Sequence, residues 1–457
     1  MKEKRADLGQ DSIMKLIWKL GLPATVAMLV NALYNLVDTI FLGHWVGKEA
    51  IAALTVAMPL QTLMMGFGLL TGVGAASMIS RSLGENRVDR ADLIAGNAFM
   101  SIAVIGTTLA VIGIFNLDPI LRLFGASATI LPYAREYMGI IFIGWVFVPM
   151  VMSANNMVRA EGDAKTAMIS MLIGTGLNLL LDPLMIYVFD LGIRGAAMAT
   201  VFSQFCAFLF LLRYFLRGGS IIKLGVQYLR LQMDIMWEMY AIGFSSFARQ
   251  LSASVVGLIM NQALVFYGGD LALAAFGIMF RVHMFVFMPL FGVVQAMQPI
   301  LGFNYGARDY HRVRDSIRIT SFVVTLAASV GTLIIMVFPR LLARIFTTDV
   351  LLIEEGIRAL RFTSFLIPIV GIQIVASVVY QAIGKAGPAL FLALARQVIL
   401  TIPLVLVLPR FFGLVGVWMV YPVADALAFA ISVTMLRWEM RVLKVELGGD
   451  RVMEEGK

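Results

Sequence analysis

The chain has 457 residues, of which 60% are hydrophobic and only 14% are charged, with a mean hydropathy of +0.88 and a net charge of +8. A water-soluble protein of this length needs more charged surface than these residues can make, so a soluble class is excluded. Apolar runs from end to end predict an all-α polytopic membrane protein, in which the excess of Lys and Arg belongs to cytoplasmic loops and no nucleic-acid partner is expected.

The apolar runs, taken in chain order, predict roughly twelve transmembrane helices. They lie near residues 16–42, 50–80, 91–116, 132–157, 164–188, 194–216, 236–267, 271–303, 314–340, 352–382, 387–409 and 413–436. If the N-terminus is cytoplasmic, roughly twenty-four Lys and Arg fall on that side of the membrane and roughly nine on the other. This asymmetry predicts a multi-pass protein of the cell (plasma) membrane with both termini in the cytoplasm.

The second half of the chain resembles the first at an offset of about 222 residues. SLGENRVDR at 82 matches NYGARDYHR at 304, and GIRGAAMAT at 192 matches GLVGVWMVY at 413. Because each half holds six spans, the two repeats have the same topology and are related by an axis along the membrane normal. We predict a first lobe over residues 1–215, a cytoplasmic linker over 216–234 and a second lobe over 235–457, arranged as a V around a central cavity.

Two aspartates lie inside predicted spans of the first half, Asp38 in the first span and Asp182 in the fifth. The aligned positions of the second half carry Met260 and Ile402, so these acids belong to the first lobe alone. A carboxylate at mid-bilayer costs about 2.5–3.5 kcal/mol on insertion scales. We expect the pair to hold a proton or a cation such as Na+; the alternative is a structural acid that is paired with an arginine or capped by backbone groups.

Other polar groups accompany these two acids on the predicted helices. Asn31 and Tyr34 share the helical face of Asp38, and Asn178 lies one turn before Asp182. A phenol and a hydroxyl from the fourth and sixth spans complete an oxygen cage for one small cation. The predicted ligands of the coupling ion, H+ or Na+, are Asp38, Asp182, Asn178, Thr200 and Tyr137; if the ion is Na+, its ligands would be Asp38, Asn178, Asp182 and Thr200.

Pro23 interrupts the first span about four turns before Asp38. A proline inside a helix removes a hydrogen bond and clashes with the preceding turn, so it bends the helix. Two interpretations stay open: a hinge that moves when Asp38 changes its protonation, or a fixed kink that shapes packing.

The predicted spans of the second half contain Arg249, Arg281, Arg396, Asp425 and a nearby His283. Cations that face a cavity could receive an anionic group. We favour an ion pair between Asp425 and Arg396 of the adjacent span, with His283 as a packing residue.

Enzyme chemistry has no support in the motifs. The sequence has no phosphate-binding loop and no HExxH, and its three His and one Cys cannot build the usual metal site. We therefore expect no cofactor and no enzymatic activity, and the energy for any transport must come from an ion gradient.

Two segments, GLPATVAMLVNALYNLVDTIFLGHWVG at 21 and GTGLNLLLDPLMIYVFDLGIRGAAMAT at 174, carry a resemblance that extends over essentially the whole chain. Together with the two six-span lobes, they resemble the multidrug and toxic compound extrusion (MATE) family, most closely its prokaryotic branch related to DNA-damage-inducible transporters. The resemblance implies a cation-coupled antiporter that exports cationic and amphiphilic drugs, such as fluoroquinolones and dyes, by alternating access.

The resemblance also assigns roles to residues of the first lobe. It implies that Asp38 is the acid that is protonated and that Pro23 is the point at which its helix bends. Flexible methionines suit a surface that binds varied flat molecules. The expected drug cleft comprises Tyr34, Asn31, Asn155, Met171 and Met28.

Two other functions stay open at this point. A flippase for a lipid-linked sugar or another polyanionic lipid would use Arg249, Arg281 and Arg396, although the first half offers no matching cations. A membrane scaffold or receptor without transport activity would leave the intramembrane acids unexplained. The expected partners are small amphiphilic or cationic drugs and membrane lipids, and we expect a monomer.

Overall fold

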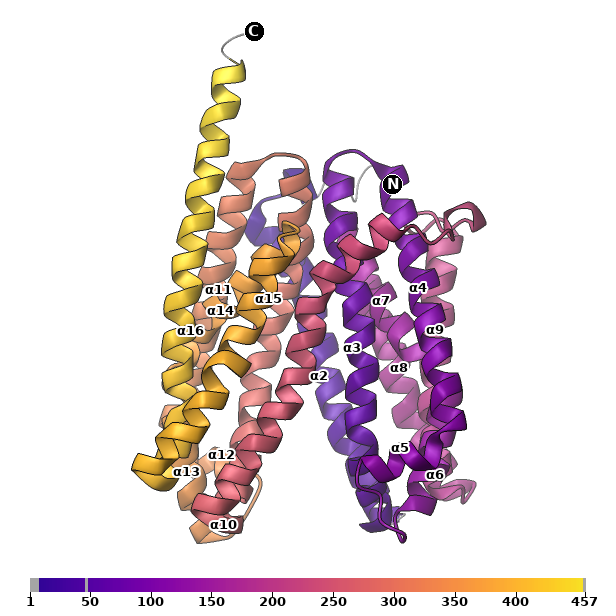
Figure 1. Ribbon diagram of the computed structural model, residues 1–457, viewed down its shortest axis with the longest axis vertical. Helices are drawn as coiled ribbons and strands as arrows, with labels where there is room; N and C mark the ends of the chain where they lie inside the picture. The colour runs from indigo at the N-terminus through magenta and orange to yellow at the C-terminus, as the bar shows by residue number, and fades with distance from the viewer. Residues whose placement is uncertain (1–7, 46–47, 455–457) are drawn as a thin grey trace.

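The computed structural model describes residues 8–45 and 48–454, without the side chains of 34–40, 42–45, 48 and 445–454. Throughout this described part the regular structure is helical, with no strand (Figure 1). The first half contains α2 (Ile13–Trp45), α3 (Lys48–Gly84), α4 (Val88–Phe115), α5 (Leu117–Leu123), α6 (Leu131–Ile143), α7 (Phe147–Ala160), α8 (Ala164–Pro183), the π-helix η1 (Leu184–Val188) and α9 (Gly192–Leu216).

A connection with one short 3-10 helix, η2 (Val226–Tyr228), leads to the second half. The second half contains α10 (Met233–Gly306), α11 (Tyr310–Val337), α12 (Pro339–Arg344), α13 (Val350–Ser364), α14 (Ile367–Ala382), α15 (Ala386–Leu394), the π-helix η3 (Ala395–Thr401) and α16 (Ile402–Glu454).

The described helices account for twelve membrane crossings. Eight segments are long and apolar enough to span a bilayer, and two bent pairs, α6 with α7 (48°) and α13 with α14 (50°), raise this to ten. Two of the eight are too long for one crossing: α10 has 74 residues, and the continuous segment Ala386–Lys444 has 59. Each of these turns back at one glycine and crosses twice, so the prediction of twelve spans is confirmed (Figure 1).

The two turning points require glycine. Gly269 has φ 64° and Gly413 has φ 56°, a left-handed conformation that disfavours side chains with a Cβ. Both ends of α10 consequently pack against the same helix, α3: a Cβ on Gly74 would meet the backbone of Met239, and one on Gly84 would meet that of Phe303. The two arms of α10 therefore form a hairpin that joins the second lobe to the first.

The molecule consists of two helical lobes that meet at one end and separate toward the other (Figure 1). Helices α2–α9 form the first lobe and α10–α16 the second, which confirms the predicted V-shaped arrangement of two bundles. Their buried apolar cores are distinct, but one first-lobe cluster also includes Met239, Ile242, Ala296, Ile300 and Phe303 from α10. This shared cluster lies where the lobes meet.

Polar contacts also join the lobes at this end. Arg312 at the start of α11 donates to the backbone oxygens of Leu8 at 3.2 Å and Asp11 at 2.7 Å. Arg81 at the end of α3 forms an ion pair with Glu238 of α10, with an N–O distance of 2.8 Å. These contacts place the start of the described chain, the end of α3 and the starts of α10 and α11 together.

The connection between the lobes is bound to the first lobe through its backbone. The amide of Lys223 donates to Asp92 of α4 at 2.8 Å, and that of Gln232 donates to Asn97 at 2.6 Å. The amide of Ile221 donates at 2.7 Å to Glu161, whose side chain is fully buried. Buried acceptors thus satisfy backbone donors of a segment that has little regular structure of its own.

Candidate functional site

The intramembrane acid of the fifth predicted span lies in the last turn of α8. Asp182 is 0% exposed, and Asn178, one helical turn earlier, donates its Nδ2 to Asp182 Oδ1 at 2.8 Å. The helix spacing in the sequence predicts this pair, and the structure confirms that the two side chains meet. A carboxylate buried at this depth is costly unless it binds a proton, a cation or hydrogen-bond donors.

The backbone beyond Asp182 departs from α-helical geometry. Pro183 has no N–H and breaks the regular hydrogen-bond ladder, and the chain continues as the π-helix Leu184–Val188. Single π-helical turns inside helices are frequent at functional sites because they leave backbone carbonyls available to ligands. Pro183 therefore ends the regular helix directly after the buried carboxylate of Asp182.

The helix that carries the other predicted acid packs against α8. Helix α2 includes Asn31, Tyr34 and Asp38, and its contacts with α8 bring the first and fifth spans together. The side chains of Tyr34 and Asp38 lie outside the described residues. Their predicted proximity to Asp182 stays a prediction, supported by the neighbouring backbones.

The remaining predicted ion ligands, Tyr137 and Thr200, have described partners of their own. Tyr137 on α6 is buried, and its hydroxyl accepts from Gln61 Nε2 at 2.9 Å. Thr200 on α9 donates its hydroxyl proton to the Ala196 carbonyl at 3.0 Å. A hydroxyl that donates along its own helix keeps its lone pairs, which are the groups that a cation needs.

The predicted drug-cleft residues are distributed over α2, α7 and α8. Asn155 of α7 is buried, and its Oδ1 has no hydrogen-bond partner among the described residues. Met28 of α2 lies at the boundary between the lobes, with its Sδ 4.0 Å from Gln295 Nε2. The single cleft formed by these residues with Asn31, Tyr34 and Met171 stays a prediction.

Pro23 lies inside α2, which is helical on both sides of it. The segment around it contacts the second lobe: a Cβ on Gly292 of α10 would lie 2.1 Å from the hydroxyl of Thr25. Any change in the bend at Pro23 would therefore disturb the contact between the lobes. The hinge remains a hypothesis.

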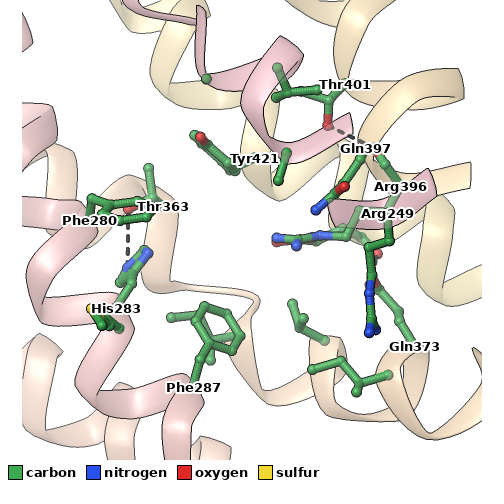
Figure 2. Close-up of a pocket in the computed structure, with 18 of the residues that line it drawn as sticks. Arg249, Phe280, His283, Phe287, Thr363, Gln373, Arg396, Gln397, Thr401 and Tyr421 are labelled. Atoms are coloured by element: carbon green, nitrogen blue, oxygen red, sulfur yellow. Dashed lines mark hydrogen bonds and ion pairs between the residues drawn. The ribbon is translucent and has the colours of Figure 1, made fainter. Parts of the chain in front are cut away.

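A cavity lies in the second lobe, where the sequence favoured an ion pair and left a ligand role for the arginines open. It has a volume of about 590 Å³, and α10, α13–α16 and η3 provide its walls. Most of the lining is apolar, with four phenylalanines and three methionines, and it also contains Asp425. Arg249, His283 and Arg396 are the other ionisable residues of the lining (Figure 2). The sequence indicated these ionisable residues but not the uncharged polar residues among them: Thr363, Gln373, Ser377, Gln397 and Thr401.

The predicted ion pair between Arg396 and Asp425 is present in this cavity. Arg396 Nε donates to Asp425 Oδ1, and the backbone oxygen of Asp425 accepts from Gln373 Nε2 at 2.8 Å. Thr401 at the end of η3 donates to the carbonyl of Arg396 at 2.8 Å. The π-helix η3 thus places Arg396 in the cavity lining, and the hydroxyl of Thr401 pairs with one carbonyl of its irregular backbone.

The other ionisable residues that the sequence indicated in this lobe are not part of this ion pair. Arg249 lines the cavity and has no ion-pair or hydrogen-bond partner among the described residues. His283 Nε2 is 2.8 Å from the hydroxyl of Ser364, as expected of a packed histidine, although its ring also borders the cavity. Arg281 is exposed and lies outside the cavity lining.

Comparisons with known proteins agree with this architecture. A model of the MatE family matches residues 23–184 and 241–407. The multidrug export protein MepA of Staphylococcus saprophyticus subsp. saprophyticus is 28% identical over 441 residues, which cover 96% of this chain and 97% of that protein.

Solved structures show the same fold. The MATE multidrug transporter DinF-BH, solved as a ligand complex, is 40% identical with a TM-score of 0.88, over 95% of this chain and 98% of that one. An outward-facing multidrug resistance MATE family transporter of the MOP superfamily is 25% identical with a TM-score of 0.91, over 96% and 98%. These matches confirm the predicted family and exclude a scaffold without transport activity. The chain belongs to the MatE family and is a multi-pass membrane transporter, not an enzyme.

Proposed function

We propose that this chain, a multidrug efflux transporter by family, is a cation-coupled antiporter. It would export cationic and amphiphilic drugs, such as fluoroquinolones and dyes, in exchange for H+ or Na+. The observation that supports the proposal best is the fully buried Asp182, which accepts from Asn178 on a helix packed against the one that carries Asp38.

The proposed coupling site is an oxygen cage in the first lobe. Carboxylates, an amide, a phenol and a hydroxyl are hard oxygen ligands that suit Na+, and the carboxylates also accept a proton. The proposed ligands are Asp38, Asp182, Asn178, Tyr137 and Thr200. Loading this cage from one side of the membrane and emptying it to the other would drive alternating access between the two lobes.

Drug binding is proposed near the coupling ion, on α2, α7 and α8. The buried amide oxygen of Asn155 provides a polar contact, and Met28 and Met171 provide adaptable apolar surface. Binding of the ion would bend or straighten α2 at Pro23, and this movement would change the cleft. The protein would act as a monomer in the plasma membrane with both termini in the cytoplasm, since the basic loops fall on that side.

The test is dye efflux from proteoliposomes under separately imposed pH and Na+ gradients. Native protein should transport under at least one of these gradients, and Asp38→Asn and Asp182→Asn should abolish gradient-driven efflux. The matched control is Asp118→Asn, which removes a partly exposed acid of α5 outside the proposed cage. Full transport by both span variants would exclude the proposed coupling site.

The alternative function is a flippase for a lipid-linked sugar or another polyanionic lipid. Arg249 and Arg396 in the second-lobe cavity favour it, but Asp425 neutralises one of them, which suits a polyanion poorly. Tight binding of lipid pyrophosphates, with no binding of cationic dyes, would favour this alternative.

A further inference from the structure

The second-lobe cavity combines an aromatic body with a small polar wall. Its apolar lining includes Phe276, Phe280, Phe287, Phe291, Met279, Met284 and Met288. Drug-sized ligands occupy pockets of roughly 300–1,000 Å³ that are mostly apolar and carry a few fixed polar groups, and a volume of about 590 Å³ falls in this range. Such a space fits one flat lipophilic molecule.

The charges of the cavity do not balance. Its lining contains two arginines and one carboxylate, and the ion pair between Arg396 and Asp425 neutralises one arginine. Arg249 has no partner among the described residues, so one positive charge is in excess. Because a guanidinium remains charged and a buried charge without a partner is costly, this wall favours an anion over a cation.

Uncharged polar atoms with unmet hydrogen bonds lie in the same cavity lining. Gln373 is 8% exposed and Ser377 is 4% exposed, and neither Gln373 Oε1 nor Ser377 Oγ has a hydrogen-bond partner in the described structure. The Nε2 of Gln373 already donates to the backbone of Asp425, so its Oε1 can only accept from a ligand. Buried polar groups are normally paired, and several orphans around one cavity indicate a site that a ligand completes.

In the close-up, Arg249, Arg396, Gln373 and Gln397 lie on one side of the cavity, and His283, Phe280 and Thr363 lie on the opposite side (Figure 2). The two arginines and two glutamines thus form one polar wall, and Phe280 lies across the cavity from it. This is the arrangement expected for an amphipathic ligand that places one end on the polar wall.

We propose that the second-lobe cavity is a binding site for amphipathic organic monoanions, with a carboxylate, sulfonate or phosphodiester on Arg249 and an aromatic or alkyl body against the phenylalanines and methionines. A hydroxyl or amine beside the anionic group donates to Gln373 Oε1. The site is separate from the first-lobe acids, and it binds its ligand without any ion gradient.

The experiment uses the full-length protein in nanodiscs of phosphatidylcholine. Isothermal titration calorimetry, corrected with empty nanodiscs, compares naphthalene-2-sulfonate, neutral naphthalene-2-sulfonamide and cationic 2-naphthyltrimethylammonium. Native protein should bind the sulfonate at least tenfold more tightly than the other two probes. Arg249→Gln should remove this preference without weakening the sulfonamide, whereas the control Arg281→Gln, which changes an arginine of the same helix outside the cavity, should retain it.

A second variant keeps the arginine and fills the space. Gly257 lines the cavity, and a Cβ there would meet nothing within 4 Å, so Gly257→Leu should fold and should block the sulfonate and the sulfonamide together. The proposal is overturned if the native protein shows no preference for the sulfonate, if the preference survives Arg249→Gln, or if Gly257→Leu binds the sulfonate normally.

The same anionic chemistry occurs in soluble molecules and in lipid headgroups. Repeating the titration in nanodiscs that contain phosphatidylglycerol distinguishes the two sources. If this lipid competes for the part of sulfonate binding that depends on Arg249, the natural occupant is an anionic lipid; if that part is unchanged, the occupant is a soluble amphipathic anion.

Discussion

Two glycines at the contact between the lobes allow a test of how that contact is held. A Cβ on Gly74 of α3 would lie 1.9 Å from the carbonyl oxygen of Met239, and a Cβ on Gly243 of α10 would lie 1.7 Å from that of Leu70. Both obstacles are backbone atoms, which no rotamer change can move. Gly74→Ala or Gly243→Ala should therefore push α3 and α10 apart.

The size of the effect follows from these distances. Ordinary van der Waals contact begins at 3.4 Å, so the two backbones must separate by at least about 1.5 Å at Gly74. Overpacking of this kind costs typically about 1–3 kcal/mol. The cost applies only while the lobes touch at this end, so the equilibrium should shift toward separation by roughly 5-fold to 150-fold.

Cysteine accessibility measures that shift. Cys206 is the one cysteine of the chain, so Cys206→Ser gives a background without thiols. Ser77 of α3 is fully buried and donates to the backbone of Gln381 across the lobes, and a Ser77→Cys reporter should react slowly with a maleimide in this background. Adding Gly74→Ala should accelerate labelling at least fivefold.

The control is Gly176→Ala on α8, where an added Cβ would meet nothing within 4 Å. It should leave the labelling rate unchanged, which shows that a glycine-to-alanine change in a helix does not itself expose the reporter. If Gly74→Ala and Gly176→Ala label alike, close backbone packing does not hold the lobes together, and the reasoning is refuted.

Three further outcomes follow from single contacts. Glu161→Ala removes a fully buried acceptor of the interlobe connection, which should cost about 1–3 kcal/mol and make residues 217–232 cleavable in limited proteolysis. Asp425→Asn leaves Arg396 without its buried counter-charge and should lower the unfolding temperature in detergent, and adding Arg396→Met should restore part of the loss. The ion pair with Arg135 lowers the pKa of Asp118 below its usual 3.8, so this pair stabilises the fold above that pH; the difference in unfolding temperature between native protein and Asp118→Asn should disappear as the pH falls below about 3.8.

The sequence alone predicted the elements that a bilayer enforces. Every backbone polar group inside the membrane must be paired within its own helix, so apolar length translates directly into spans. The predicted breaks between spans, at 267–271 and 409–413, coincide with the reversals at Gly269 and Gly413, but the structure alone identified these glycines as the turning points. The pairing of Asn178 with Asp182, by contrast, follows from the helical period.

The second-lobe cavity could not be predicted by those arguments. Its polar wall comes from α10, α14, η3 and α16, and their relative rotation is set by packing, not by any local pattern. The sequence predicted Arg396 and Asp425 as partners and left a ligand role for the arginines open. What it lacked was the position of Arg249, which shares the cavity but not the ion pair.

The internal repeat makes the chemical difference between the lobes informative. The fifth span ends in a π-helix beside an aspartate, and the repeat-equivalent eleventh span contains a π-helix that carries an arginine, Arg396, although the two π-helices do not occupy aligned residues. Irregular backbone within a bilayer is tolerated only where protein or a cavity covers it. Both lobes thus contain a break in the equivalent span, and the side chains beside the two breaks differ in charge. If each lobe has its own site, the two lobes should select ligands of opposite charge. Asp182→Asn should then reduce cation-dependent flux and leave binding of naphthalene-2-sulfonate unchanged. Arg249→Gln should weaken binding of naphthalene-2-sulfonate and leave cation-dependent flux unchanged. An equal effect of both variants on both measurements would mean that one shared site, not two, extends across the lobes.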